Sequence, residues 1–186
     1  MTIVTVTTPT RRLTLEQRRE LSSTLTDAVL VPEVGQKIPA ARAGFQVRFI
    51  ELAADAMAIG GVLLADQPES VDAMSIDVAV MDAAWPRDVR ARVISNVLGA
   101  MAKACGLEVA PSGWWVTFHV IEEGSWGSRG GVLSILDLLR SGVFTAERIT
   151  EIETVILGAR VGATSRPSGS EKHSGNSILG VTGAVA

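Results

Sequence analysis

The sequence holds few of the residues on which disulfide-stabilised and metal-dependent proteins rely. It has one cysteine, Cys105, and two histidines, His119 and His173, among its 186 residues. A single cysteine forms no internal disulfide, which is typical of a reducing compartment, and we therefore expect a cytoplasmic protein. A structural zinc site needs about four Cys or His ligands. We expect no metal ion.

Other absences exclude further classes of function. The formal charge is −3, which argues against a surface that binds nucleic acid. No phosphate-binding loop or dinucleotide fingerprint follows any expected strand, and no serine nucleophile motif is present. The most apolar stretch, residues 49–65, is interrupted by Glu51 and Asp55, so we expect no membrane span of roughly 20 apolar residues. Any chemistry is expected to use no cofactor.

What the sequence does contain is one unit that occurs twice, about 70 residues apart. Residues 2–6 and 75–81 are rich in β-branched residues and are predicted to be strands. Each is followed by apolar residues at helical spacing, such as Leu21, Leu25 and Val29 in the first unit. Each helix precedes a second strand and a Gly-Gly pair.

This order predicts an α+β fold built from tandem β-α-β units. The two units would form a four-stranded mixed sheet with two helices on one face, followed by a C-terminal helical extension. The other face would stay apolar and uncovered, which implies an oligomer. We expect one domain over residues 1–144, with halves at about 2–66 and 74–135. Residues 145–186 would form a C-terminal helix and a flexible tail.

The same segments resemble a known family. Several features of the sequence resemble the tautomerase superfamily. They are a strand from residue 2, the arginines that follow it, the segment LTLEQRRELSSTLTDAV, and the two Gly-Gly endings, ARAGFQVRFIELAADAMAIGG and WVTFHVIEEGSWGSRGG. The likeness is to its branches similar to macrophage migration inhibitory factor and to fused 4-oxalocrotonate tautomerase, and it covers about residues 2–131. It implies a homotrimer in which an amino-terminal proline moves a proton. Thr2 stands at that position, so the chain would be an atypical member.

The resemblance also suggests catalytic residues. Removal of Met1 would leave a Thr2 amine, whose unperturbed pKa of about 7.7–8.0 suits a general base once burial and nearby cations lower it. Arg12 would hold a substrate carboxylate or the enolate oxygen. Glu122 and His119 are alternative proton carriers. The alternative for each residue is an ordinary structural place, such as a strand residue or a solvated turn.

Five further residues are candidates for substrate binding. Arg11, Lys37 and Arg48 would supply positive charge, and Trp115 and Trp126 would wall an apolar pocket. The alternatives are exposed cations and tryptophans that pack at a subunit interface. Of the tryptophans, Trp126 is the pocket residue that the resemblance favours.

Two functions remain open on the sequence. The first is a cofactor-free enzyme of the tautomerase or isomerase type, acting on a small carbonyl or carboxylate compound through an enol or enolate. The same residues would also serve hydration, Michael-type addition or ring closure. The alternative is a trimeric binding or structural protein that has lost its catalytic proline. Neither function involves nucleic acid or a membrane.

Overall fold

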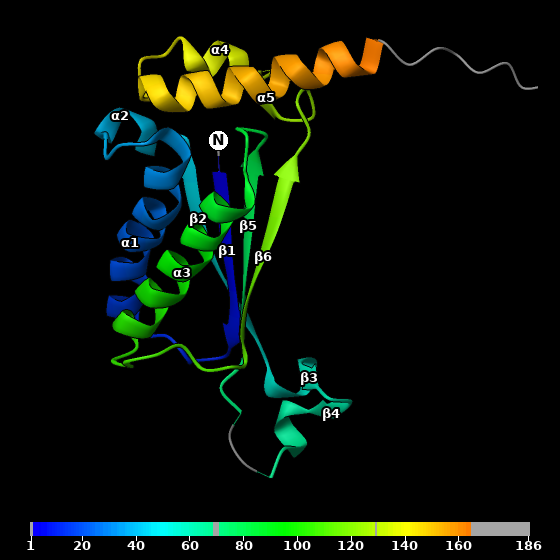
Figure 1. Ribbon diagram of the computed structural model, residues 1–186. Coiled ribbons are helices and arrows are strands. Elements are labelled where there is room, and N and C mark those ends of the chain that lie inside the picture. The colour runs from blue at the N-terminus through cyan, green and yellow to red at the C-terminus, as the bar shows by residue number, and fades with distance from the viewer. Residues whose placement is uncertain (1, 69–70, 129, 165–186) are drawn as a thin grey trace, which may run out of the picture.

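The chain folds into a layer of helices on one face of a sheet, with two further helices across one end of that sheet (Figure 1). The structure is a computed structural model that describes residues 2–68, 71–128 and 130–164. Its elements, in order, are β1 Thr2–Pro9, α1 Leu15–Val34, α2 Pro39–Arg42, β2 Phe45–Leu52, the 3-10 turn η1 Ala54–Ala56, β3 Ala58–Ile59, β4 Val62–Leu63, the 3-10 turn η2 Leu64–Asp66, β5 Met74–Met81, α3 Arg87–Ala104, β6 Trp114–Ile121, β7 Gly127–Ser128, β8 Gly131–Val132, α4 Ile135–Leu139 and α5 Ala146–Thr164.

The four long strands form one mixed sheet in the order β2-β1-β5-β6. β1 is parallel to β2 and β5 is parallel to β6, while β1 and β5 are antiparallel. Thr2 therefore lies between Phe45 of β2 and Val80 of β5, and Val80 in turn faces Val120 of β6. The predicted tandem β-α-β fold with a four-stranded mixed sheet is confirmed.

Local sequence signals set the starts and ends of both long helices. The Thr14 hydroxyl accepts a hydrogen bond from the Gln17 amide, and the Gln17 side chain accepts one from the Thr14 amide, so α1 opens with a capping box. α3 begins directly after Pro86 and ends before Gly106, which has the positive φ of 69° that favours glycine. These signals depend only on neighbouring residues.

The end of α1 differs from the expected one. A proline inside a helical pattern usually ends the helix at the preceding residue, so Pro32 favours an end near Val31. Instead α1 passes through Pro32 to Val34 and ends at Gly35, whose φ is 83°. Leu30 and Val34 are both buried, so packing in this turn compensates for the amide hydrogen that Pro32 lacks.

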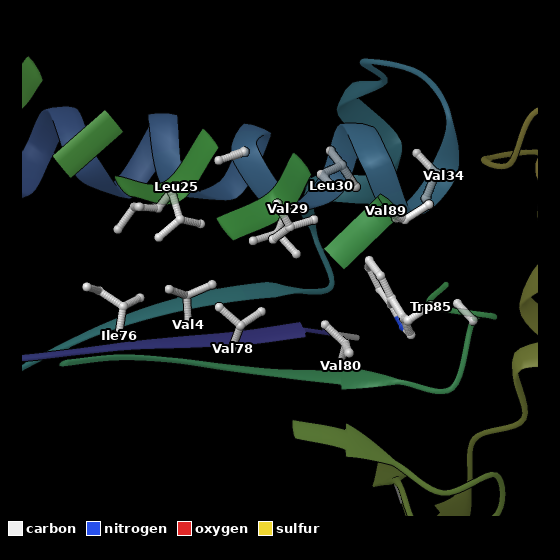
Figure 2. Close-up of a cluster of buried hydrophobic side chains, with 14 of the residues drawn as sticks. Val4, Leu25, Val29, Leu30, Val34, Ile76, Val78, Val80, Trp85 and Val89 are labelled. Carbon is white, nitrogen blue, oxygen red and sulfur yellow. The ribbon is translucent and has the colours of Figure 1, made fainter. Parts of the chain in front are cut away.

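The hydrophobic core lies between the sheet and the pair α1 and α3 (Figure 2). β1 and β5 alternate between buried and half-buried residues, so every second side chain faces the helices. Full burial of one such Leu or Val contributes about 1.5–3 kcal/mol. The fully buried core residues include Val4, Val6, Leu21, Leu25, Val29, Ile76, Val78, Val93 and Val97.

The opposite face of the sheet is mixed in character, and the prediction of an apolar face is wrong there. Its centre carries Asp77, which lies 3.4 Å from His119, and Arg48, which donates to the Gln46 side chain. Exposed apolar residues such as Trp115 flank this polar centre. Asp77 and His119 are on neighbouring strands, and Arg48 and Gln46 are both on β2, so these polar side chains have partners on this face.

The segment after β8 packs on the domain at the end where β1 begins (Figure 1). Ile135 and Leu139 of α4 and Ile152 and Ile156 of α5 are buried in the same hydrophobic cluster as the sheet. The predicted C-terminal helix is therefore part of the packed core. The predicted flexible tail, with His173, falls outside the described residues. Within the described ranges, no helix is long and apolar enough to cross a membrane.

Leu25 tests the packing of α1 on the sheet. Replacement of Leu25, which is fully buried, by Ala should lower the free energy of unfolding by about 2–5 kcal/mol, because it leaves a cavity. Urea denaturation measures this change. Leu15 is on the same helix and 58% exposed, so Leu15→Ala should change stability by no more than about 0.5 kcal/mol. Equal losses would contradict this assignment of the core.

Candidate functional site

The start of β1 is buried inside the protein. Thr2 lies on the face of β1 that points toward the helices, and it is fully buried. Its main-chain nitrogen donates to the Gly44 carbonyl oxygen at 3.1 Å. β1 is paired as far as its first residue, because β2 on one side and β5 on the other both pair with Thr2. The amino end of β1 is therefore a fixed interior position.

A buried carboxyl group lies next to Thr2. The extra turn of α1 brings Glu33 to this position, where it is 3% exposed. The Thr2 hydroxyl donates to Oε2 of Glu33 at 3.1 Å. Burial raises the pKa of the Glu33 carboxyl to about 7, against the opposing effects of the positive amino terminus, the Thr2 hydroxyl and Arg148. Both protonation states of this carboxyl are accessible near neutral pH.

Arg148 of α5 holds together the segments around Glu33. It is 6% exposed, and its Nε donates to the main-chain carbonyl of Glu33 at 3.1 Å. Its Nη2 donates to the carbonyls of Ala83 and Ala84 at 2.7 and 3.2 Å, and its Nη1 contacts Glu151. The guanidinium thus links α5, the end of α1 and the segment that leads into α3.

A cavity of about 400 Å³ opens beside Glu33. Glu33 and Gly44, which both hydrogen-bond to Thr2, are part of its wall. Among the described residues that line it, Glu33 is the one with an ionisable side chain. The rest of the wall is mainly apolar and includes Leu30, Val34, Phe45, Leu133, Leu138 and Phe144.

Arg12 lies at the opposite end of β1 from Thr2. Eight residues of strand, at about 3.3 Å each, put more than roughly 20 Å between the two ends. The Arg12 guanidinium makes two hydrogen bonds to Asp72, at 2.7 and 2.8 Å, and lies over the ring of Trp114. These hydrogen bonds hold the pKa of Asp72 below its usual value. Within one protomer, Arg12 and Thr2 do not share a site.

Other predicted binding residues are also held elsewhere. The Arg11 amide donates to Glu51 at 2.6 Å, in a turn where Arg11 has a φ of 63°. Lys37 is exposed and pairs with Asp27 at 2.7 Å. Arg42 pairs with the same carboxylate. None of these cations is part of the cavity wall beside Glu33.

The remaining candidates divide between the open sheet face and the end of β6. Arg48, His119 and Trp115 are on the open face, where Trp115 is 69% exposed. Glu122 is exposed and Trp126 is half-buried, in the segment after β6. This segment reaches the same end of the sheet as Thr2 because Thr2 faces β5 and β5 pairs with β6.

Glu123 follows Glu122 and has a structural partner. Its carboxylate accepts the amide hydrogen of Ile135 at 3.0 Å, at the start of α4. Of the four residues predicted to be catalytic, Thr2 is the one that contacts Glu33. Within the described ranges, no group of three or more Cys, His, Asp or Glu side chains could hold a metal ion.

Solved structures share this arrangement of strands and helices. A fused 4-OT described as a wild-type symmetric trimer matches 75% of this chain and 98% of its own, with 18% identity and a TM-score of 0.56. A member of the cis-3-chloroacrylic acid dehalogenase family matches 70% of this chain and 82% of its own, with 20% identity and a TM-score of 0.54. The chain has the same fold as these two proteins.

A macrophage migration inhibitory factor from Toxoplasma gondii shows the same fold. It matches 70% of this chain and 99% of its own, with 12% identity and a TM-score of 0.51. The sequence itself matches no protein-family model and no curated protein. Between a quarter and a third of this chain lies outside what these solved structures match.

The sequence did not point to Glu33 as a functional residue. A signal for it exists, since Leu21, Leu25, Val29 and Glu33 recur every four residues and α1 places such residues on one face. A glutamate that continues an apolar stripe either marks the place where the helix leaves the core or is itself a buried acid. Because Pro32 favours a helix end before Glu33, the sequence alone does not predict the buried acid.

Glu33 should make the stability of the protein depend on pH. Below about pH 4.3 its carboxyl is protonated in the folded and the unfolded chain, and it has no effect. As the pH rises toward 7, the unfolded chain loses this proton while the folded protein keeps it. The free energy of unfolding should therefore fall, on the order of 3 kcal/mol, and level off above pH 7.

Urea denaturation between pH 4 and pH 8 measures this fall. Glu33→Gln should remove it, because the amide does not titrate. Glu20→Gln changes an exposed glutamate on the same helix and should leave the fall intact. An unchanged pH dependence in Glu33→Gln would contradict the assignment.

Proposed function

We propose that this chain is a cofactor-free enzyme of the tautomerase type, which moves a proton on a small carbonyl compound. One observation carries the proposal. Glu33, a residue that is 3% exposed, accepts a hydrogen bond from the Thr2 hydroxyl at its carboxyl group, and the residue lines a cavity of about 400 Å³. Buried acids in concave sites with a shifted pKa are frequent general acids and bases.

Glu33 has the properties that proton transfer needs. A general base works best when its pKa lies near the working pH, and a pKa of about 7 meets this condition. The hydrogen bond from Thr2 to Oε2 fixes the orientation of the carboxyl group. Thr2 therefore positions the Glu33 carboxyl group, and this role is the same whether Met1 is retained or removed.

The proposed reaction needs no partner beyond the substrate. The Glu33 carboxylate removes a proton from the carbon next to the substrate carbonyl. The electrons of the broken C–H bond form the C=C bond of an enol or enolate, and an O–H bond forms on Glu33. Return of that proton to the substrate oxygen or to another carbon completes the tautomerisation and regenerates the carboxylate.

The Thr2 amine is a second proton carrier in this proposal only if Met1 is removed. Its nitrogen lies 3.1 Å from the Gly44 carbonyl oxygen, and Gly44 is part of the cavity wall. Intact-mass measurement decides whether Met1 is retained. Arg12 is not used within the protomer, because its guanidinium is bound to Asp72.

We also propose a homotrimer in the cytoplasm. One matched fused 4-OT is a symmetric trimer, and the uncovered sheet face of this chain carries exposed apolar residues such as Trp115 and Ile50. The free thiol of Cys105 fits a reducing compartment. Without measurable catalysis, the same assembly would be the binding or structural protein of the alternative hypothesis.

Hydrogen exchange at enolisable carbons tests the activity. In D₂O, the protein should speed deuterium uptake next to the carbonyl of small ketones above the buffer rate, as followed by NMR. Glu33→Gln should lower this rate by about 10²–10⁴-fold, because it removes the general base. In the wild-type protein, the rate should rise with pH through about 7, as Glu33 ionises.

The control for this experiment is Glu20→Gln, an exposed glutamate of the same helix that should keep the full rate. Equal rates in wild type and Glu33→Gln would show that Glu33 is not the base. No rate above buffer with any enolisable compound would favour the non-catalytic alternative.

A further inference from the structure

The end of α1 is capped by residues that come more than a hundred positions later in the chain. The last carbonyl groups of a helix have no partner within the helix itself. In α1, the Val34 carbonyl accepts the Thr145 amide hydrogen at 2.9 Å, and the Glu33 carbonyl accepts from Nε of Arg148 at 3.1 Å. The start of α5, which lies across the end of the sheet in Figure 1, therefore completes the cap of α1.

The two segments approach each other closely at this cap. Gly35, the residue after α1, has a φ of 83°, and a Cβ atom there would lie 2.5 Å from the Thr145 hydroxyl oxygen. Only glycine permits so close an approach. The Gln36 side chain also donates to the Val143 carbonyl at 3.0 Å. The end of α1 and the start of α5 therefore form one packed unit.

Arg148 extends this unit to the segment that leads into α3. Its Nη2 donates to the carbonyls of Ala83 and Ala84 at 2.7 and 3.2 Å. Ala84 has a φ of 48°, which is unfavourable for a residue other than glycine, so its conformation depends on its surroundings. Because Arg148 is 6% exposed, these hydrogen bonds are shielded from water. A single guanidinium thus fixes two segments relative to α5.

The turn of α1 that Arg148 contacts is one that its own sequence disfavours. Pro32 lacks an amide hydrogen, so the residues after it gain less from helix formation. Glu33 directly follows Pro32, and its carboxyl group meets the Thr2 hydroxyl in this helical conformation. If the turn were released, the carboxyl group would gain access to water, which favours its charged form.

We propose that Arg148 is a positioning residue, which holds the last turn of α1 so that the Glu33 carboxyl group stays buried against Thr2. The inference rests on the proposed function, in which Glu33 is the general base, and it makes α5 part of the same site. The planar guanidinium donates in several fixed directions at once, as the contacts of Arg148 require. A lysine ammonium has the same charge but sits on a flexible stem and lacks this planar geometry.

The charges around Glu33 determine which variant isolates the geometry. The amino terminus and Arg148 both act on the Glu33 carboxyl group as positive charges, and Glu151 contacts the Arg148 guanidinium. Arg148→Lys keeps the positive charge in this region and removes the planar group of donors. An effect of this variant on Glu33 therefore reports the loss of positioning.

Titration of the Glu33 carboxyl carbon by carbon-13 NMR, with its signal assigned through Glu33→Gln, tests the role of Arg148. The wild-type midpoint should lie at about 7. In Arg148→Lys it should fall by about one pH unit or more, because the released carboxyl group gains water. Arg140→Lys, a control at a side chain that is 83% exposed, should leave the midpoint unchanged. An unchanged midpoint in folded Arg148→Lys would overturn the proposal, since a merely structural role lowers stability without moving it.

A second measurement uses the wild-type protein and does not depend on the folding of a variant. The Gly35 amide donates to the Val31 carbonyl at 2.9 Å, and the Thr145 amide donates to the Val34 carbonyl. If the start of α5 holds the end of α1, both hydrogen bonds open in one event. Native-state hydrogen exchange should then give protection factors that agree within about threefold and depend equally on urea. Independent exchange of the two amides would overturn the proposal.

Titration and catalysis separate this inference from the proposed function. In the deuterium-uptake assay at pH 8, Arg148→Lys should lower the rate by about tenfold or more, because the base is no longer held in one orientation. A shifted Glu33 midpoint without deuterium uptake in the wild type would support the role of Arg148 and overturn the proposed activity. Deuterium uptake in the wild type, with an unshifted midpoint and an unchanged rate in Arg148→Lys, would support the activity and overturn the inference.

Discussion

The antiparallel pairing of β1 with β5 is the contact on which the rest of the molecule depends. It joins two β-α-β halves into one sheet and sets α1 beside α3 on the same face, where both bury their apolar residues. Because the paired strands run in opposite directions, corresponding features of the two halves lie at opposite ends of the sheet. The protein therefore has two related ends that could diverge independently.

The two ends have become chemically different. Thr2 and Met74 each begin a strand by donating the main-chain amide to a glycine carbonyl, at 3.1 and 3.3 Å. At the first end, α1 presents Glu33, and α5 covers it. At the corresponding place near the end of α3 is Cys105, which lies beside Arg12 and its ion pair with Asp72. Among the described residues, the first end is the one that combines a buried acid with a mainly apolar cavity.

The sequence was informative wherever neighbouring residues decide the structure. Runs of β-branched residues predicted the strands at residues 2–6 and 75–81, and apolar residues at helical spacing predicted the helix after each. It misled where packing overrode a local signal. Pro32 marks an apparent helix end, yet α1 continues because Leu30 and Val34 are buried in that turn. The polar centre of the open face was likewise hidden, since cross-strand partners are distant in sequence.

By itself, the sequence determined that two β-α-β units follow one another and that the first strand starts at the tip of the chain, because side-chain periodicity and caps are local properties. The tertiary structure alone decided that Thr2 meets Glu33 and that Arg12 is far from both. These distances depend on strand register and on the docking of α5, where residues more than a hundred positions apart, such as Glu33 and Arg148, come into contact. Burial and charge compensation, which set the chemistry of Glu33, exist only once those distant segments have packed.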